Sequence, residues 1–403
     1  YSHSFINPFD SHAKTEILRY MRNFIDLYGT DHLYLYGGYS EEHEGIAPTK
    51  EERERIATQT SKVAAEIKAE LDPEGRFYAG GGWLSGEGRS MWASIGFGGD
   101  DRLHANLPAL ITRMNQEAAG GGVTDFTISS ELKNPNYIWW QLATRLAWDP
   151  QGVDLNRFVE DYTRRRYGSS HYDTMLEVTR TLFDALYSKS YVHLADGKLM
   201  SITNSPFYHF PYIGFGATIT FPVVDDSYGN AASAHYLHNK QTIPELEAAI
   251  TKALEVSDSL SVNPLYRTDL FDMTRTYLGL VSNQAYLDAY CAFKSGDLNA
   301  FLARRQKLEE ILVDIEKLLS TRQDFSMKAW IADITSVPGT NPAAEEMLRQ
   351  GNINADYANR DGFELMHHYY IPRVKLHLDL LERKLREGNT KCTMSEMMDD
   401  FRK

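Results

Sequence analysis

The chain has no long apolar runs and almost no cysteine. No apolar stretch approaches the roughly 20 residues needed to cross a bilayer, so no membrane-spanning helix is expected. The first residues show neither a basic n-region nor an apolar h-region, so no signal peptide is expected either. The two cysteines, Cys291 and Cys392, are too few for a disulfide framework and lack metal-site spacing. We expect two isolated thiols.

Basic residues are also in the minority. The 42 Lys and Arg residues face 55 Asp and Glu residues, which gives a net charge of −13. Because nucleic-acid binding depends on a basic surface that displaces counterions, this balance argues against a nucleic-acid partner. The charge should approach zero in mildly acidic solution, which suits an acidic compartment. The sequence has no HExxH motif and no GxGxxG motif, and it has no N-glycosylation sequon that would hint at secretion.

Strand and helix signals alternate over the first third of the chain. Short β-favouring runs occur at 33–36, 77–79, 91–95 and 123–128, and helical patterns at 50–71, 103–116 and 135–148. This alternation is typical of parallel βαβ units. A closed (β/α)8 barrel needs eight strands and only four are predicted, so the domain is either part of a barrel or an open sheet.

After Trp148 the pattern becomes helical. The apolar spacing predicts a helix that ends at Tyr167 with Gly168 as its C-cap, then a second helix over 171–187. A long irregular loop is expected over 196–239, and helices over 243–385, where Pro372 should kink or break the last helix. The expected fold class is α/β plus all-α: a partial (β/α)8-type, TIM-like barrel in residues 1–148, followed by an all-α domain in residues 149–403.

Two of the strand signals end in small polar residues and then a glutamate. Glu41 and Glu42 follow the first strand, and Glu131 follows the strand at 123–128. A (β/α) barrel keeps its catalytic groups just past the carboxyl ends of its strands, and a pair of carboxylates can cleave a glycosidic bond. The alternative for Glu41 and Glu42 is a solvated acidic loop. The alternative for Glu131 is an acid in the first turn of a helix.

Aromatic residues accompany these glutamates. Trp83 follows three glycines, where its ring could stack on a sugar or simply pack in the core. Tyr39 lies in the stretch that leads to Glu41, and Phe97 lies in a turn of small residues after another strand. The adjacent His367 and His368 point about 100° apart on a helix, so we expect a buried or interfacial aromatic cluster there rather than a metal site.

Segments along the whole chain resemble, in order, those of the lysosomal and bacterial alpha-N-acetylglucosaminidases. The resemblance rests on Gly29-Thr-Asp-His-Leu-Tyr34, Gly82-Trp83-Leu84, Phe97-Gly-Gly99, Glu131 seventeen residues before Trp148, residues 154–168, residues 266–275, Asp356-Tyr-Ala-Asn359 and Tyr369-Tyr-Ile-Pro-Arg373. In the early segments it covers the second part of a catalytic barrel, and in the later ones an all-helical C-terminal domain.

The resemblance implies a retaining exo-glycosidase that removes terminal α-linked N-acetylglucosamine from glycans such as heparan sulfate. It makes Glu41 the acid/base and Glu131 the nucleophile, and places Trp83, Glu42, Tyr39 and Phe97 at the sugar. Retention requires the two carboxyl groups to lie roughly 5–5.5 Å apart. The resemblance implies no metal or organic cofactor, a lysosomal or secreted/periplasmic location, and a second segment or chain that completes the barrel. A homo-oligomer is a further expectation.

The chain departs from the family pattern at several places. Ser40 stands where the family has Asn before the acid/base glutamate, and Gly96 replaces the Asn of the Asn-Phe-Gly-Gly turn. The first barrel strands and a Trp-Gly-Pro stretch near 351–355 are missing. Two alternatives therefore remain open: a related barrel glycosidase with another sugar substrate, or a non-catalytic glycan-binding or structural protein on a decayed barrel.

Overall fold

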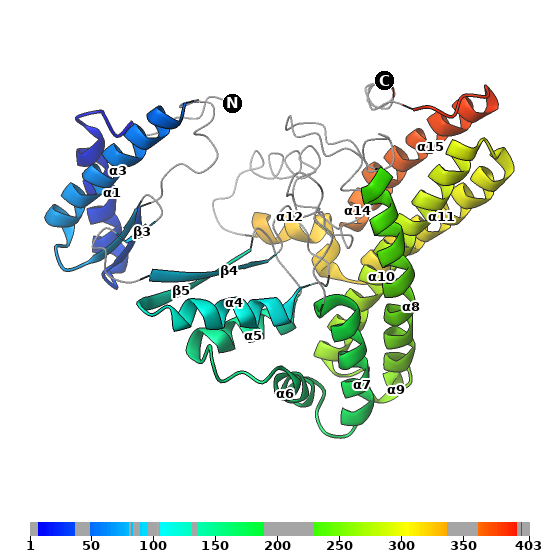
Figure 1. The fold of residues 1–403 in the computed structure, drawn as a ribbon, viewed down its shortest axis with the longest axis horizontal. Coiled ribbons are helices and arrows are strands. Elements are labelled where there is room, and N and C mark those ends of the chain that lie inside the picture. Colours follow the sequence, from blue (N-terminus) through cyan, green and yellow to red (C-terminus); the bar gives the residue numbers. More distant parts are fainter. Residues whose placement is uncertain are drawn as a thin grey trace. The chain divides into compact units, whose positions relative to one another are not determined.

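The structure of the chain is a computed structural model, and it is mostly helical (Figure 1). It describes residues 7–36, 49–79, 82–83, 89–95, 103, 105–130, 136–188, 229–336, 362–392 and 396. The chain forms two compact units, one of residues 1–92 with 114–127 and the other of residues 93–113 with 128–403. The division into domains 1–148 and 149–403 stays a prediction.

The first unit contains a small mixed sheet. Strand β1 (Leu33–Tyr36) pairs in parallel with β2 (Arg76–Ala79), and β2 pairs antiparallel with the two-residue β3 (Gly82–Trp83). Helices α1 (Ala13–Tyr28) and α3 (Lys50–Leu71) accompany the sheet. The parallel pairing expected from strand–helix alternation is confirmed for β1 and β2.

Helix α3 was predicted from its sequence with the bounds that the structure has. Its start is fixed by a capping box, in which the Thr49 hydroxyl accepts from the Glu52 N–H while the Glu52 carboxylate accepts from the Thr49 N–H. Its apolar side chains meet those of α1 and the sheet in a core of Leu18, Tyr34, Val63, Ile67 and Phe77. The rings of Tyr34 and Phe77 stack in this core with centroids 4.4 Å apart.

Strands β4 (Arg89–Ile95) and β5 (Val123–Ser130) pair with each other, which confirms the two strands predicted there. Helix α4 (Leu107–Ala119) begins four residues later than predicted. The reason is Pro108, whose fixed φ suits the first turn of a helix and whose missing N–H would leave a gap further inside. Helix α5 (Tyr137–Trp148) follows the segment that contains Glu131.

The remaining described residues of the second unit are mostly helical. Its elements are α6 (Leu155–Tyr167), α7 (Tyr172–Leu182), the π-helical turn η2 (Phe183–Tyr187), α8 (Gly229–Leu254), α9 (Ser257–Leu260), α10 (Pro264–Ser295), α11 (Leu298–Ser320), the 3-10 turn η4 (Gln323–Phe325), α12 (Met327–Thr335), α14 (Phe363–Leu365), the π-helical turn η5 (Met366–Tyr370) and α15 (Ile371–Arg386). Gly168 caps α6 as predicted.

The predicted loop over 196–239 is wrong for its last residues, because α8 begins at Gly229. The Gly, Pro, Tyr and Phe content that suggested a loop belongs to the part before this point. From Gly229 onward the sequence runs Gly-Asn-Ala-Ala-Ser-Ala, and alanine is the strongest helix former.

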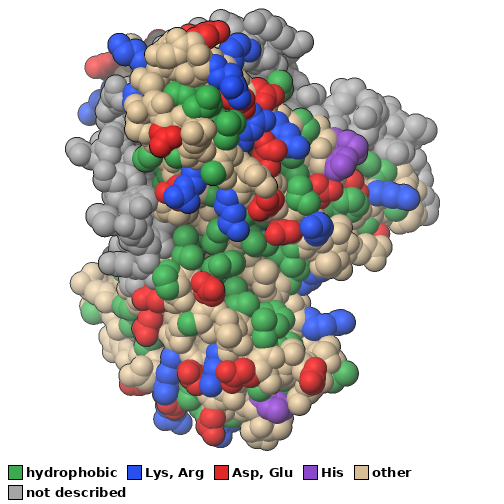
Figure 2. Space-filling view, turned by 90° about the vertical axis from the view of Figure 1, so that its right-hand side faces the viewer, with side chains coloured by type: hydrophobic (Ala, Val, Ile, Leu, Met, Phe, Trp, Pro, Cys, Tyr) green, Lys and Arg blue, Asp and Glu red, His purple; other side chains and the backbone are tan. Residues whose placement is uncertain are grey.

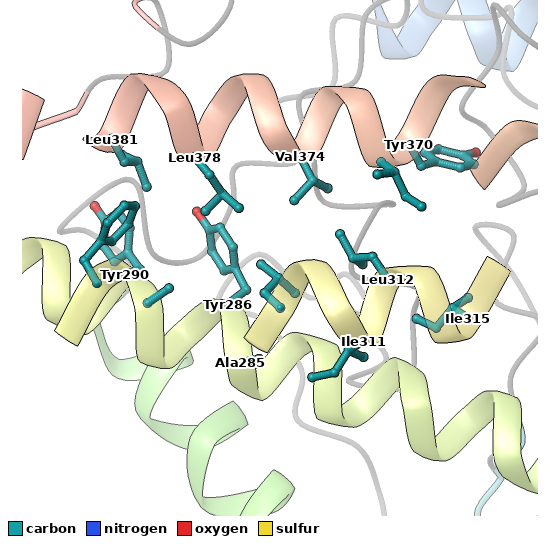
Figure 3. Packing of buried hydrophobic residues seen from close by; sticks show 14 of the residues in the cluster. Ala285, Tyr286, Tyr290, Ile311, Leu312, Ile315, Tyr370, Val374, Leu378 and Leu381 are labelled. Atoms are coloured by element: carbon teal, nitrogen blue, oxygen red, sulfur yellow. The ribbon is translucent and has the colours of Figure 1, made fainter. Parts of the chain in front are cut away.

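Helices α10 and α11 form a tight hairpin and lie side by side (Figure 1). Gly296 ends α10 in the left-handed conformation, with φ of 77°, and the Asp297 carboxylate caps α11 by accepting from the Ala300 N–H at 2.9 Å. Helix α15 covers the hairpin. In Figure 3 its Val374, Leu378 and Leu381 point toward aromatic and aliphatic side chains of the two hairpin helices, among them Tyr286 and Leu312. This interface is the main core of the second unit.

Pro372 marks a change of helix type rather than a break. The π-helical turn η5 runs directly into α15, and Pro372 lies in the first turn of α15. A proline there removes only one N–H, which would have bonded to the preceding turn. The π-helical turn accommodates this missing hydrogen bond without ending the helix. None of the described helices is long and apolar enough to cross a membrane.

Candidate active site

Most of the predicted site residues lie outside the described residues. These are Tyr39, Glu41, Glu42, Phe97 and Glu131, as well as Ser40 and Gly96. Trp83 is described in its main chain only. The structure therefore describes the strands and helices next to these residues in the sequence. The roles of the residues stay predictions.

The pairing of β1 and β2 fixes one edge of the predicted site. The last residues of the two strands, Tyr36 and Ala79, are register partners. Because the carboxyl ends of parallel strands meet at one edge of a sheet, the segment to Glu41 and the segment to Trp83 both leave from this edge. Trp83 itself was expected on a glycine-rich loop, but it lies in β3 opposite Tyr78. It therefore returns along β2 instead of extending away from it.

The opposite, amino-terminal edge of these strands is held by a network around Asp72. Its Oδ2 atom lies 2.6 Å from the His32 Nδ1 atom and accepts a hydrogen bond of 2.9 Å from the Tyr34 hydroxyl. The His32 contact and the hydrogen bond from Tyr34 lower the pKa of Asp72 against the opposing effect of its burial. Gly75 is required beside it, because a Cβ atom there would lie 2.6 Å from the Asp72 carboxylate. We interpret this network as structural, since it lies at the edge opposite to the one from which the Glu41 segment leaves.

A buried charge cluster lies beside the start of α5, six residues after Glu131. Arg166 on α6 forms a bidentate ion pair with Asp269 on α10, and the Tyr167 hydroxyl donates to Asp269 at 2.6 Å. The Arg166 guanidinium also lies 5.0 Å from the centroid of the Tyr137 ring, the first residue of α5. Burial disfavours the Arg166 cation, but the hydrogen bonds to Asp269 outweigh this effect and raise its pKa.

Further charges lie next to this cluster. Asp272 and Arg275, both on α10, pair at 3.3 Å, and burial raises the pKa of Asp272. Arg322 pairs with Asp324 at 2.6 Å. The pKa of the Tyr137 phenol is raised mainly by burial and then by the charge of Asp272. The cluster therefore fixes where α5 begins and which charges face its first residue.

The charge cluster around Arg166 and Asp269 was not predicted from the sequence. The one available signal was the resemblance of residues 154–168 and 266–275 to family segments, which contain Arg166 and Asp269 respectively. A run of three arginines at 164–166 is otherwise typical of a solvated helix end, because cations are favoured near a helix C-terminus. Only the fold shows that Arg166 turns inward while Arg164 and Arg165 stay exposed.

The two histidines differ from expectation. His367 and His368 are exposed rather than buried, with their rings edge to face at 4.6 Å, and the His367 Nδ1 atom lies 2.9 Å from the Glu316 carboxylate. The described residues contain no group of three or more His, Cys, Asp or Glu side chains that could hold a metal ion. Both cysteines are free thiols, with Cys291 exposed and Cys392 buried.

The surface charge is mixed. On the face shown in Figure 2, Lys and Arg side chains alternate with Asp and Glu side chains, and neither sign forms a broad patch among the described residues there. Any recognition of a charged ligand on that face would therefore have to be local.

Comparison with known proteins agrees along most of the chain. The family model for the alpha-N-acetylglucosaminidase (NAGLU) C-terminal domain matches residues 158–403. The alpha-N-acetylglucosaminidase of Homo sapiens is 26% identical over 320 residues, covering 74% of this chain and 39% of the human protein. The chain thus spans well under half the length of this curated relative.

Solved structures show the same fold. A family 89 glycoside hydrolase from Clostridium perfringens, in complex with 2-acetamido-1,2-dideoxynojirmycin, has a TM-score of 0.60 at 20% identity and covers 77% of this chain and 35% of its own. A variant from the same organism with two glutamates replaced by glutamine, in complex with its substrate GlcNAc-alpha-1,4-galactose, has a TM-score of 0.63 at 19% identity, covering 85% and 43%. On the match of its helical part and on its ordered resemblance elsewhere, the chain belongs to the alpha-N-acetylglucosaminidase family.

Proposed function

We propose that this chain is part of a retaining glycoside hydrolase that removes terminal α-linked N-acetylglucosamine from a glycan. Glu41 acts as the acid/base and Glu131 as the nucleophile, on a partial (β/α) barrel whose sugar site includes Trp83, Glu42, Tyr39 and Phe97. The observation that carries the proposal is the parallel register of β1 and β2, from whose common carboxyl edge the Glu41 and Trp83 segments leave. Family membership supports the same assignment.

The proposed chemistry uses two carboxylates in different states. Glu41 holds a proton for the leaving oxygen, while Glu131 is ionised and attacks the anomeric carbon to form a covalent glycosyl-enzyme. Glu41 then removes a proton from the water that releases the sugar, so both carboxyl groups return to their starting state. The bacterial structure with two glutamates replaced by glutamine is in complex with its substrate GlcNAc-alpha-1,4-galactose, which supports the proposal of two catalytic glutamates.

The charge cluster has a positioning role in this proposal. It anchors Tyr137 through Arg166, and Tyr137 begins the helix that follows the Glu131 segment. A nucleophile must be held within a fraction of an ångström of the reacting atom, and a buried ion pair is a rigid anchor for such a segment.

A partner segment is also proposed. Helix α1 packs one face on α3 and the sheet, but Tyr20, Phe24, Leu27 and Tyr28 on its other side are exposed by 50% to 75%. Strand β1 next to it in sequence is an edge strand of the described sheet. An exposed apolar stripe and an open strand edge in the same unit fit a further strand–helix unit, which is the segment that would continue the barrel. A lysosomal or secreted/periplasmic location is proposed from the family resemblance alone.

Hydrolysis of a chromogenic α-N-acetylglucosaminide tests the function. The assay uses the protein together with the segment that completes the barrel. We expect its wild type to release the chromophore, Glu131→Gln to abolish release, and Glu41→Gln to lower kcat by at least about a hundredfold, the order that one general acid–base group contributes. Glu42→Gln is the matched control, one residue away from the proposed acid, and it should change KM more than kcat. Activity that survives in Glu131→Gln, or a wild-type protein with a complete barrel that does not hydrolyse the substrate, would contradict the proposal.

A further inference from the structure

The helical unit contains a groove of its own. It has a volume of about 600 Å³ and is open to solvent between α5, α6 and the loop that joins them. Arg145, Trp148, Arg157, Asp161 and Arg165 line it, together with the loop residues around Gly152. Its size falls within the range of ligand sites in proteins.

Trp148 gives the groove an aromatic wall. It is the last residue of α5, and its side chain is 88% exposed, whereas Leu146 two residues earlier is fully buried. Leaving a tryptophan this exposed forgoes the burial of a large apolar surface. The ring is therefore available to stack on a flat apolar face of a ligand, such as one face of a pyranose ring.

Two arginines of the groove have no side-chain partner among the described residues. Arg157 and Arg165 lie eight residues apart on α6, which places them on one face of the helix about 12 Å apart. Neither guanidinium makes an ion pair or hydrogen bond with another described residue, in contrast to the neighbouring Arg166 and Arg180. The two acids three residues from Arg157 are both engaged elsewhere: Asp154 caps α6 and Glu160 pairs with Arg180.

Arg145, the third arginine of the groove, makes only a weak ion pair. Arg145 lies 3.8 Å from the Asp149 carboxylate, and both side chains are about half exposed. Such a pair contributes little stability, so an incoming anion can compete for the guanidinium. In a chain of net charge −13, three available arginines around one exposed tryptophan are a local exception.

We propose that this groove is a second binding site for an acidic stretch of glycan, in which Arg157 and Arg165 bind sulfate or carboxylate groups and Trp148 stacks on a sugar ring. The proposal deepens the proposed function and depends on it for the class of ligand. Planar guanidinium groups bind sulfate and carboxylate in a bidentate manner, and their separation suits anions on different sugars of one chain. In this role the groove binds a part of the glycan other than the terminal sugar that is removed.

Binding of a fluorescein-labelled heparin tetrasaccharide tests this proposal. The tetrasaccharide is prepared with a lyase, so it has no terminal α-linked N-acetylglucosamine and is no substrate of the proposed reaction. We expect wild type to bind it, Arg157→Gln/Arg165→Gln to raise the Kd at least about tenfold, and Trp148→Ala to raise it several-fold. Binding should weaken with added salt because the charges are exposed.

The matched control removes the same charge elsewhere. Arg267 and Arg304 are also exposed on helices of this unit, and Arg267→Gln/Arg304→Gln should leave the Kd within about twofold of wild type. Equal losses in both double variants would mean nonspecific charge attraction and would overturn the proposal. Absence of tetrasaccharide binding by wild type would also overturn the proposal. If Trp148→Ala then changes the oligomeric state, Trp148 contacts another copy of the chain and not a glycan.

Two further probes separate the ligand chemistry from the reaction. A desulfated tetrasaccharide that keeps its carboxylates should bind more weakly than the sulfated one, and the neutral disaccharide GlcNAc-α-1,4-galactose should show no dependence on Arg157 and Arg165. Hydrolysis of the small chromogenic substrate should be unchanged in the groove variants. Failure of that hydrolysis in the wild-type protein with a complete barrel contradicts the proposed function, whereas failure of tetrasaccharide binding contradicts the proposed groove site.

Discussion

At the scale of single residues, His377 makes the protein sensitive to acid. Its imidazole is 1% exposed on α15, and its Nε2 atom lies 2.8 Å from the Tyr286 hydroxyl on α10. Burial lowers its pKa from 6.5 to about 3, so the folded state keeps it neutral where the unfolded state binds a proton. Its contribution to stability is therefore complete above about pH 6.5 and is lost as the pH falls toward 3, at about 1.4 kcal/mol for each pH unit.

We expect His377→Gln to flatten this pH dependence. Glutamine can still bond to the Tyr286 hydroxyl but does not titrate, so the free energy of unfolding in urea should fall less between pH 7 and pH 4.5 than it does in wild type. The free energy of unfolding at pH 7 alone does not test the prediction, because the replacement also alters packing. His368→Gln, at an exposed position, should keep the wild-type slope. An unchanged slope in His377→Gln would show that other groups govern the acid response.

At the scale of elements, the ion pair between Arg166 and Asp269 joins α6 to α10. Both side chains are largely buried, at 7% and 13% exposure. Asp269→Asn leaves the Arg166 cation buried without its counter-charge, so we expect the free energy of unfolding to fall by about 3 kcal/mol. Asp333→Asn removes an exposed carboxylate from α12 and should change stability by less than about 0.5 kcal/mol. Similar urea midpoints for the two variants would contradict a structural role for the pair.

The sequence predicts elements well where local signals act alone. The capping box at Thr49 set the start of α3, and Gly168 set the end of α6. Helix α1 was missed, since it begins after His12 without a side-chain cap, although Ile17, Leu18, Met21 and Ile25 recur at helical spacing.

The candidate site was harder to predict. No local pattern tells an arginine that turns inward from one that stays in solvent, so neither the buried Arg166 nor the open groove beside Arg165 was foreseen. Both depend on where α10 and the α5–α6 loop lie, which is set by contacts between residues about 100 positions apart in the case of Asp269.

At the scale of the whole molecule, the apolar stripe of α1 predicts self-association of this chain by itself. Apolar patches of this kind mark interaction surfaces, and without the proposed strand–helix partner a second copy can cover the stripe. We expect sedimentation at micromolar concentration to show dimers or larger species for wild type and a monomer for Phe24→Lys/Leu27→Glu, which keeps the net charge. Val313→Lys/Leu376→Glu makes the same change at exposed apolar positions on α11 and α15 and should leave association as in wild type. If the α1 variant associates as wild type does, the stripe is not the contact, and the proposal that it receives a further barrel segment loses its physical support.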